Sequence, residues 1–283
     1  MAEILKGAPV AAALSEELIA RAEALKQAGT VPTLAILRVG ERPDDISYET
    51  GAMKRCGKIG IAVKRFLLPE GCTKEQLLDT IREINGDGSI HGCLIFRPLP
   101  DKDMEEAACS LLAAEKDVDG MTGGSMASVF TGKGAGFPPC TAQACIELLD
   151  HYGVALTGKR AAVIGRSLVI GKPVAMMLQQ RNATVTMCHT RTVDLSSVCR
   201  EAEIVIAAAG KAGIVGKDFV APGQVVVDVG INVDENGKLC GDVKFDEVEP
   251  VVAAITPVPG GVGAVTTAVL AKHVIEAAEM KQK

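Results

Sequence analysis

Gly158-Lys-Arg-Ala-Ala-Val-Ile-Gly-Arg-Ser-Leu-Val-Ile-Gly-Lys-Pro173 is the stretch that decides how this chain folds. Residues 161–164 form a short apolar run, which predicts a buried strand. Gly165 and Gly171 bracket the turn that follows, and Pro173 stands where the first turn of a helix tolerates a proline. A strand, a glycine turn and a helix begin a dinucleotide-binding fold, in which the helix N-terminus binds a pyrophosphate. The glycine spacing is not G-x-G-x-x-G, so this pattern alone fits an ordinary strand-to-helix turn equally well.

The rest of the chain alternates short apolar runs with amphipathic segments. Strands are predicted over residues 33–37, 63–68, 92–96, 184–188, 204–208 and 225–229. Helices are predicted over residues 8–28, 45–58, 73–85, 104–114, 141–152 and 265–280, with a hairpin around Gly237. This alternation predicts an α/β fold in which parallel sheets carry helices on both faces.

Two domains are expected, because 283 residues exceed one typical domain. Lys116-Asp-Val-Asp-Gly120 opens a glycine-rich connection that runs to Pro138-Pro139, and this connection is the best candidate for a boundary. We therefore predict a first domain over residues 1–139, completed by a C-terminal segment over residues 262–283. A Rossmann-like domain is predicted over residues 140–261.

The composition argues against several classes of protein. With 48% hydrophobic and 23% charged residues, the chain can bury full cores. A net charge of −5 gives no electrostatic case for a nucleic acid or a membrane as partner. No apolar run approaches the roughly 20 residues of a membrane span, and the N-terminus lacks the pattern of a signal peptide.

Nine cysteines are scattered along the chain, mostly within apolar stretches. No C-x-x-C pair occurs, which argues against zinc ribbons and thioredoxin-like sites. We expect reduced, buried thiols in a cytoplasmic protein, and no metal site.

Four stretches together resemble the methylenetetrahydrofolate dehydrogenase/cyclohydrolase family, and the resemblance covers essentially the whole chain. They are Ser47-Tyr48, Lys116-Asp-Val-Asp-Gly120, the Gly165–Pro173 turn with Cys188-His-Thr-Arg-Thr192, and Pro257-Val-Pro-Gly-Gly261. The resemblance implies NADP on the Rossmann-like domain, a folate in the cleft between domains, and a homodimer. Members of the family oxidise 5,10-methylene- to 5,10-methenyltetrahydrofolate, and usually hydrolyse that product to 10-formyltetrahydrofolate.

The residues near the predicted ribose favour NADP over NAD. NAD-selective folds usually hold an acidic residue there for the 2′-OH. This chain instead has Arg166, Thr190 and Arg191, whose guanidinium and hydroxyl groups suit a 2′-phosphate. Each arginine taken alone is more often a solvated surface charge. The resemblance implies that the cofactor site also includes Gly165, Ser167, Gly171 and, near the nicotinamide, Ile231.

The resemblance also implies the substrate site. Asp119 corresponds to the family aspartate that binds the pterin ring, because a carboxylate can pair with the adjacent ring N–H and amino group. The alternative is that Asp119 only caps a turn. Tyr48 is expected against the folate, and Tyr48 and Asp119 are the expected catalytic residues. Further substrate contacts are expected from Leu99 and from Pro259, Gly260 and Gly261, whose bare backbone approaches a ligand closely.

Three positions depart from the family pattern, and one of them is Ala264, which stands where the family usually has a proline after the glycine at 263. The family helix carries Tyr-x-x-x-Lys, and this lysine usually catalyses the cyclohydrolase step, but here the position is Ala52. The glutamine that partners the lysine is replaced by Phe96. Lys54 is two residues further on, about 200° around the helix from Ala52, so it points away from the site. Arg55 stays protonated and cannot act as a base.

These departures affect the two reactions differently. Hydride leaves a carbon flanked by two nitrogens, and no proton has to be removed in that step. Hydrolysis requires proton transfers, which a positioned group accelerates by about 10²–10⁴-fold. We therefore predict a dehydrogenase with weak or absent cyclohydrolase activity. Two alternatives remain open: a bifunctional enzyme in which another group or a water network replaces the lysine, and a non-catalytic folate- or nucleotide-binding relative.

Overall fold

The structure is a computed structural model that describes residues 1–235 and 237–282. The chain divides into two compact units. Unit 1 comprises Met1–Ala12 and Thr141–Thr266, and unit 2 comprises Ala13–Cys140 and Thr267–Lys283. Lys283 itself, the last residue of the predicted C-terminal segment, lies outside the described residues.

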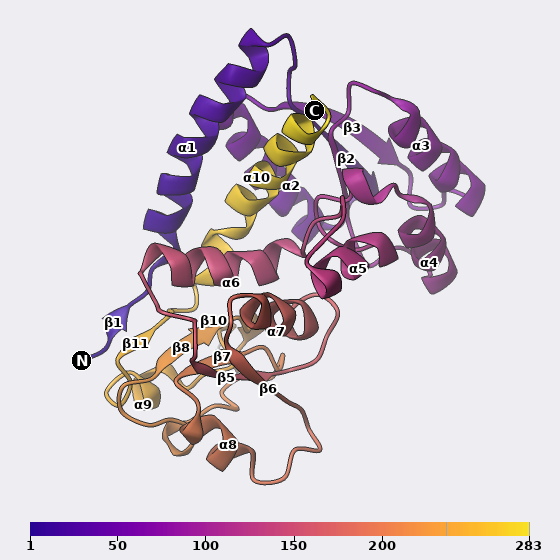
Figure 1. Cartoon of the computed structure of the whole chain (residues 1–283). Coiled ribbons are helices and arrows are strands. Elements are labelled where there is room, and N and C mark those ends of the chain that lie inside the picture. Colours follow the sequence, from indigo (N-terminus) through magenta and orange to yellow (C-terminus); the bar gives the residue numbers. More distant parts are fainter. Residues whose placement is uncertain (236, 283) are drawn as a thin grey trace. The chain divides into compact units, whose positions relative to one another are not determined.

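Unit 1 is built on a six-stranded parallel sheet with the order β1-β11-β8-β7-β5-β6 (Figure 1). The strands are β1 (Glu3–Ile4), β5 (Arg160–Ile164), β6 (Thr184–Cys188), β7 (Ile204–Ala207), β8 (Val225–Asp228) and β11 (Ala254–Ile255). The four longer strands confirm the sequence prediction. The two-residue strands are too short to leave an alternating pattern. The first 12 residues group with unit 1, not with residues 13–139 as predicted, because β1 pairs with β11.

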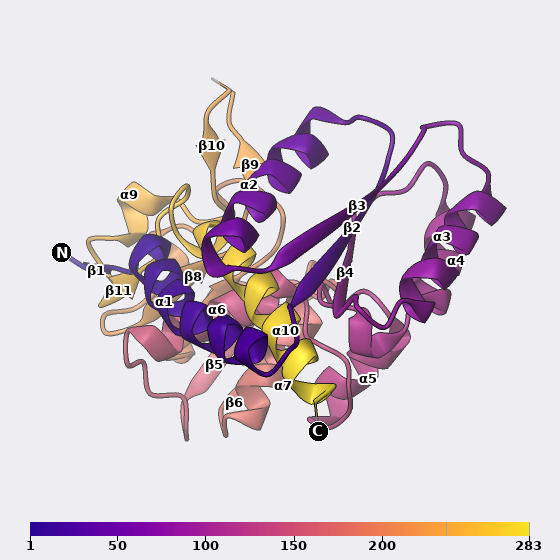
Figure 2. The ribbon, with the colours of Figure 1, turned by 90° about the horizontal axis from the view of Figure 1, so that it is seen from above.

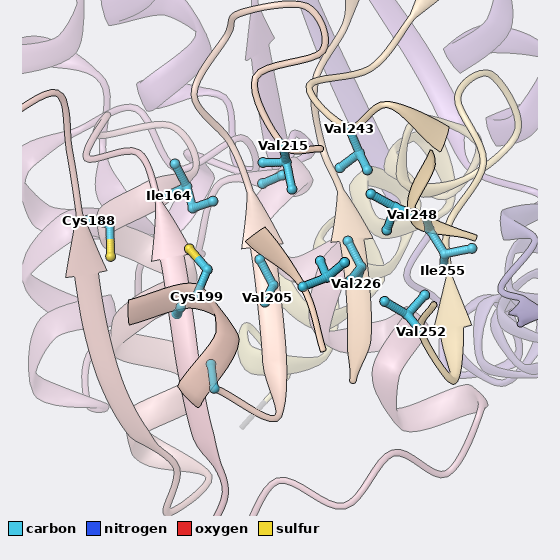
Figure 3. Packing of buried hydrophobic residues seen from close by; sticks show 14 of the residues in the cluster. Ile164, Cys188, Cys199, Val205, Val215, Val226, Val243, Val248, Val252 and Ile255 are labelled. Carbon is cyan, nitrogen blue, oxygen red and sulfur yellow. The ribbon is translucent and has the colours of Figure 1, made fainter. Parts of the chain in front are cut away.

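Side chains from successive strands pack in one apolar layer in unit 1. Figure 3 shows Ile164, Val205, Val226 and Ile255 projecting from β5, β7, β8 and β11 in this cluster. Burial of residues on both faces is expected where a parallel sheet is covered by helices. Because the strands run parallel, their carboxyl ends meet at one edge of the sheet.

The remaining elements of this part of the chain connect the strands. They are α6 (Cys140–His151), α7 (Gly171–Gln180), α8 (Leu195–Glu201), η2 (Lys217–Phe219), α9 (Phe245–Val248), η3 (Val262–Ala264) and the hairpin of β9 (Asn232–Val233) and β10 (Leu239–Cys240). The hairpin confirms the turn predicted around Gly237, which has a φ of 76°.

The direction of strand succession changes at β5. The chain places β6 on one side of β5 and then β7 on the other. Open parallel sheets bind ligands outside the carboxyl ends of the strands at such a switch point. The end of β5, next to β7, is therefore where unit 1 is expected to bind a ligand.

Unit 2 contains a three-stranded parallel sheet with the order β3-β2-β4. Helices α3 and α4 cover one face of this sheet, while α2 and α10 lie on the other (Figures 1 and 2). The central strand β2 is buried along its whole length, as a strand covered on both faces should be. The elements are α1 (Gly7–Gln27), β2 (Thr33–Val39), α2 (Pro43–Ile59), β3 (Ala62–Leu68), α3 (Lys74–Gly86), β4 (Gly92–Ile95), α4 (Lys102–Leu111), η1 (Ala114–Lys116), α5 (Gly123–Thr131) and α10 (Thr266–Met280). No helix among the described residues has the length and apolarity needed to cross a bilayer.

Helix α5 lies in the stretch for which the sequence predicted an irregular glycine-rich connection, so that prediction is wrong there. The Asp117 carboxylate accepts hydrogen bonds from the Met121 N–H (3.0 Å) and the Thr122 N–H (2.7 Å). The Thr122 side chain in turn accepts from the Ser125 N–H at 3.1 Å. Side-chain acceptors for the first N–H groups of a helix offset the low helix propensity of its glycines.

The buried Lys116 should contribute strongly to the stability of unit 2. Its ammonium donates hydrogen bonds to the carbonyls of Ile84 (2.6 Å), Asn85 (2.9 Å) and Asp87 (2.8 Å) at the C-terminal end of α3. Lys116→Met removes all three donors, so we expect the free energy of unfolding to fall by about 3 kcal/mol in urea denaturation. The exposed Lys133→Met is the control, and equal losses in the two variants would contradict this role.

Candidate functional site

The turn after β5 is closed by two glycines that touch each other. Gly165 has a φ of 129°, and a Cβ there would overlap the carbonyl oxygen of Ala208, which follows β7. A Cβ on Gly171, the first residue of α7, would overlap the carbonyl of Gly165. Both positions therefore require glycine. The turn brings the N-terminus of α7 to the switch point of the sheet, where backbone N–H groups and the helix dipole favour an anion.

Ser167 shapes the same turn from within. Its hydroxyl accepts a hydrogen bond from the Ile170 N–H at 3.1 Å, and its carbonyl accepts from the Lys172 N–H at 3.0 Å. Ser167 thus has a structural role at the start of α7, in addition to the cofactor contact predicted for it.

Three predicted ribose-side residues lie at one edge of the sheet. Ile164 pairs with Cys188, so the turn that carries Arg166 lies beside the loop that follows β6. This loop is tight, because the His189 N–H donates to the Thr192 hydroxyl (2.9 Å) and the Arg191 N–H to His189 Nδ1 (3.2 Å). Arg166, Thr190 and Arg191 are all exposed. The edge therefore presents two guanidinium groups and a hydroxyl to solvent.

Two buried aspartates, Asp228 and Asp242, hold the loops that surround Ile231. Asp242 accepts hydrogen bonds from the N–H groups of Ala209 (2.6 Å), Gly210 (2.9 Å) and Lys211 (2.9 Å). Asp228 accepts from the N–H groups of Gly230 (2.9 Å), Asp242 (3.0 Å) and Val243 (3.0 Å), and burial raises its pKa to about 6. Ile231 itself is 72% exposed beyond the end of β8. Neither role could be predicted from local sequence patterns, since most partners of the two aspartates are backbone N–H groups of distant loops.

Backbone contacts also hold the loop over residues 257–261 in place. Pro259 and Gly260 are exposed, whereas Gly261 is buried. The Gly7 N–H donates to the Gly260 carbonyl at 2.8 Å, and a Cβ on Gly261 would overlap the Pro257 carbonyl. The loop therefore keeps its exposed tip in a fixed position.

In unit 2 the structure brings Tyr48 and Phe96 together. Their rings meet edge to face, with centroids 5.9 Å apart and an interplanar angle of 81°. Such pairs contribute about 0.5–1.5 kcal/mol beyond their buried area. Ala52, one turn of α2 after Tyr48, is 1% exposed, and Phe96 is 9% exposed. As expected, Lys54 is exposed, and Arg55 donates to the Ser15 hydroxyl at 2.9 Å.

A buried ion network lies on the same helix. The Glu49 carboxylate accepts hydrogen bonds from Arg38 of β2 at 2.8 Å and from Arg65 of β3 at 2.5 Å. Both carboxylate oxygens are engaged, so Glu49 anchors the Tyr48 turn of α2 to two strands of the sheet. An uncompensated charge at this depth would cost several kcal/mol, roughly 3–5 when one partner is removed.

Leu99, another predicted substrate contact, belongs to the core of unit 2. Its side chain packs in the cluster between the sheet and helices α3 and α4. Its N–H donates to Glu105 Oε2 at 3.1 Å, and Glu105 also lies 3.7 Å from the Arg97 guanidinium. Leu99 therefore holds the segment after β4 in place through both its side chain and its backbone.

The Asp119 carboxyl interacts with the Cys140 thiol, with the negative charge of Asp117 and with the positive charge of Arg97. Burial raises the pKa of its carboxyl, and Asp117 also raises it, while hydrogen bonds from Cys140 and the positive charge of Arg97 lower it. Cys140 in turn lies next to His273, with 3.9 Å between Cys140 Sγ and His273 Nδ1. Sequence reasoning missed both residues, because they are 133 positions apart and neither carries a local motif.

Models of two domain families match the chain. The tetrahydrofolate dehydrogenase/cyclohydrolase catalytic domain matches residues 5–119, and the NAD(P)-binding domain of the same family matches residues 139–282. The Bifunctional protein FolD of Carboxydothermus hydrogenoformans is 54% identical over 282 residues, which cover 99% of this chain and 98% of that protein.

Solved structures agree with these matches. The bifunctional FolD of Campylobacter jejuni has a TM-score of 0.93 at 39% identity, covering 99% of this chain and 100% of that one. The Trypanosoma brucei methylenetetrahydrofolate dehydrogenase-cyclohydrolase, solved with NADP and an inhibitor, has a TM-score of 0.91 at 33% identity. The match covers 100% of this chain and 99% of the trypanosomal one.

The glycine requirement at position 165 can be tested with a matched pair of variants. Gly158 also has a positive φ, 76°, but a Cβ there would meet nothing within 4 Å. Gly158→Ala should therefore cost about 1 kcal/mol of unfolding free energy, from backbone strain alone. Gly165→Ala should cost about 1–3 kcal/mol more, because of the overlap with Ala208. Equal losses in urea denaturation would refute the close approach.

Proposed function

The chain belongs to the tetrahydrofolate dehydrogenase/cyclohydrolase family. From this premise we propose that it oxidises 5,10-methylenetetrahydrofolate to 5,10-methenyltetrahydrofolate with NADP, and that it hydrolyses the product weakly or not at all. The observation that carries the second part is the apolar contact of Tyr48 with Phe96 beside the buried Ala52, where the family has its Lys and Gln.

The cofactor proposal is supported by the edge of the sheet in unit 1. The turn between Gly165 and Gly171 brings the N-terminus of α7 to the switch point of the sheet, where we propose that the pyrophosphate binds. Arg166, Thr190 and Arg191 offer the groups that bind a 2′-phosphate. NADP, when bound, supplies a nicotinamide ring that accepts a hydride. The exposed Ile231 is the apolar side chain proposed to lie against that ring.

The folate proposal is supported by the environment of Asp119. A carboxylate that pairs with a pterin must be ionised, and burial works against this. The hydrogen bonds from Cys140 and the charge of Arg97 favour the ionised form. We propose that Tyr48 packs against the pterin ring and that the backbone of Pro259, Gly260 and Gly261 approaches the ligand. Leu99 would act mainly by holding the segment after β4 in place.

The two reactions place different demands on these residues. In the oxidation, lone pairs of the two flanking nitrogens stabilise the cation that forms, so the protein has to orient the reactants and exclude water. The Tyr48–Phe96 pair suits that task, because it is apolar and fixed. In the hydrolysis a water must lose a proton as it attacks, and a ring nitrogen must later gain one. Neither Ala52 nor Phe96 can hold or move a proton.

Full bifunctionality is the second candidate, and it is favoured by the name of the Carboxydothermus relative at 54% identity. It requires another group or a water network to replace the lysine. A non-catalytic folate- or nucleotide-binding role is the third candidate. It is less well supported, because the residues of both proposed sites are present together.

We also propose a homodimer. Val233 and Leu239 pair directly across the β9–β10 hairpin, and both are exposed, so this hairpin offers a small apolar surface. Sedimentation equilibrium of the purified protein tests the proposal.

Restoring the missing pair should restore hydrolysis. In the double variant Ala52→Lys/Phe96→Gln we expect the rate of methenyltetrahydrofolate hydrolysis to rise by about 10²-fold, with the dehydrogenase rate changed by less than about threefold. Ala52→Met/Phe96→Gln is the control, because methionine fills similar space without an amine. Fast hydrolysis by the unmodified protein, or an equal gain in the control, would contradict the proposal.

The new lysine would also lie three positions after Glu49, one turn along the helix. Glu49 already binds Arg38 and Arg65, so it should not capture the ammonium fully. Phe96 offers the ammonium no hydrogen-bond acceptor, so Ala52→Lys alone should give a smaller gain in hydrolysis than the double variant.

Arg191 should select NADP through the 2′-phosphate. Arg191→Ala removes one charge-assisted contact, so the KM for NADP should rise about tenfold while the KM for NAD stays within about twofold. Arg160→Ala is the matched control, because Arg160 is an exposed arginine at the opposite end of β5. A parallel rise of both KM values in Arg191→Ala would show that this residue does not read the phosphate.

A further inference from the structure

Unit 2 contains a cavity at the edge of its sheet that is opposite to Phe96. The cavity has a volume of about 380 Å³, which is within the range of sites for small organic ligands. His91 immediately precedes β4 and Thr33 begins β2, so the cavity lies at the amino ends of these parallel strands. Phe96 and Arg97 follow the carboxyl end of β4. The cavity is therefore separate from the candidate folate site.

Three segments that are distant in the sequence line this cavity. They are residues 29–33 between α1 and β2, residues 88–91 between α3 and β4, and residues 278–282 at the end of α10. Figures 1 and 2 show the end of α10 beside the segment that joins α1 to β2. The Gln282 amide donates to the Thr30 hydroxyl at 3.0 Å and so ties these two segments together.

His91 contributes a hydrogen-bond donor to the cavity. Its Nδ1 accepts from the Thr33 N–H at 3.2 Å, so the neutral ring carries its hydrogen on Nε2. Burial and the positive charges of Lys281 and Lys116 lower the pKa of His91, which keeps the ring neutral. Within the described part of the chain, Nε2 has no hydrogen-bond acceptor. Because the residue is 6% exposed, a ligand oxygen in the cavity would satisfy this donor.

Lys281 adds a positive charge at the rim of the cavity. Its ammonium donates to the Gly88 carbonyl, and a Cβ on Gly88 would lie 3.5 Å from its Nζ. This ammonium forms no ion pair with any residue that the structure describes. The charge of Lys281 is therefore available to an anion.

Of the three hydroxyl groups that line the cavity, one has a hydrogen to offer. The Thr33 hydroxyl donates to the Val31 carbonyl at 2.9 Å, and the Ser89 hydroxyl donates to Asp87 at 2.7 Å. The Thr30 hydroxyl accepts from Gln282, and its own hydrogen has no acceptor among residues 1–235 and 237–282. Thr30 is thus the third donor, with His91 and Lys281.

The carboxylate that acts on His91 belongs to Asp87, and its charge is already compensated. Asp87 forms an ion pair with Lys64 at 2.7 Å and accepts from the Ser89 N–H at 2.8 Å. These contacts hold the pKa of Asp87 well below its usual range. The carboxylate therefore does not cancel the attraction of Lys281 for an anion.

We propose that this cavity binds a small organic phosphate, whose phosphate group accepts hydrogen bonds from His91 Nε2, the Thr30 hydroxyl and the Lys281 ammonium. A phosphate group has three strong acceptor oxygens and so can engage all three donors. The group alone would leave most of the cavity empty, and Val31 and Ala278 give the cavity apolar walls for the organic part. The site is distinct from both sites of the proposed function and does not depend on them.

Nuclear magnetic resonance of the histidine side chains tests the site in the full-length protein. Glycerol 3-phosphate is the probe, and excess NADP keeps the probe from the proposed cofactor site. The Nε2–H signal of His91, assigned by its loss in His91→Phe, should shift in a saturable manner. Sodium chloride at equal ionic strength should not shift it. Inorganic phosphate should bind at least about tenfold more weakly, because it lacks the organic part. The absence of a saturable shift would overturn the proposal, and equal affinity for the free ion would overturn the assignment to an organic phosphate.

Matched variants identify the donors by calorimetric titration with the same probe. Lys281→Met should raise the Kd about tenfold, the effect of losing one charge-assisted contact. Lys133→Met removes the same charge from an exposed position outside the cavity and should leave the Kd within about twofold. An equal Kd in these two variants would refute the site.

The role of His91 needs a second pair of variants. His91→Phe should also raise the Kd about tenfold, whereas His91→Gln keeps an N–H donor and should bind more tightly than His91→Phe. Equal binding by the unmodified protein and a folded His91→Phe would contradict the role of His91. If His91→Phe does not fold, because the Thr33 N–H loses its acceptor, the comparison of Lys281→Met with Lys133→Met decides the proposal.

Discussion

The backbone after β5 passes so close to the backbone after β7 that only a residue without a side chain fits. A Cβ on Gly165 would overlap the Ala208 carbonyl, and a Cβ on Gly171 would overlap Gly165 in turn. This close approach sets where α7 begins, and with it the anion-binding end of unit 1. The parallel register of β5 and β6 then puts the His189–Thr192 loop beside the turn. The residues proposed to select NADP are thus positioned by a steric constraint in the backbone.

Unit 2 depends in the same way on an anchored loop. Lys116 donates to three carbonyls, the Asp117 carboxylate accepts from the N–H groups of Met121 and Thr122, and the Val118 carbonyl accepts a hydrogen bond from His273. These contacts fix the backbone on both sides of Asp119. By contrast, the Tyr48 and Phe96 rings meet edge to face, and Ala52 is buried one turn of α2 after Tyr48. Ala52 and Phe96 carry no group that accepts or donates a proton, which is the ground for proposing weak hydrolysis.

Local patterns predict the longer strands of the sheet well, because each is a short run rich in apolar residues. For β6 the predicted bounds, Thr184–Cys188, are those of the structure. Patterns failed where the stabilising partner is distant or unusual. Helix α5 starts with glycines, with Thr122 as its cap and the Asp117 carboxylate bound to the N–H groups just before it, and β1 is a two-residue strand paired with residues 254–255. The sequence predicts the glycine turn after β5. The reason that glycine is required there, the close approach of the Ala208 carbonyl, is visible only in the folded chain. The contact of Cys140 with His273 could not be predicted from either segment alone.

The stoichiometry of a single reaction tests the central claim most directly. Purified protein would be mixed with 5,10-methylenetetrahydrofolate and excess NADP, and NADPH and methenyltetrahydrofolate would be quantified over time, with a no-enzyme reaction correcting for spontaneous hydrolysis. We expect methenyltetrahydrofolate to accumulate in a ratio of about one to one with NADPH, since each hydride transfer yields one of each. Formation of NADPH with little methenyl compound and matching 10-formyltetrahydrofolate would contradict it.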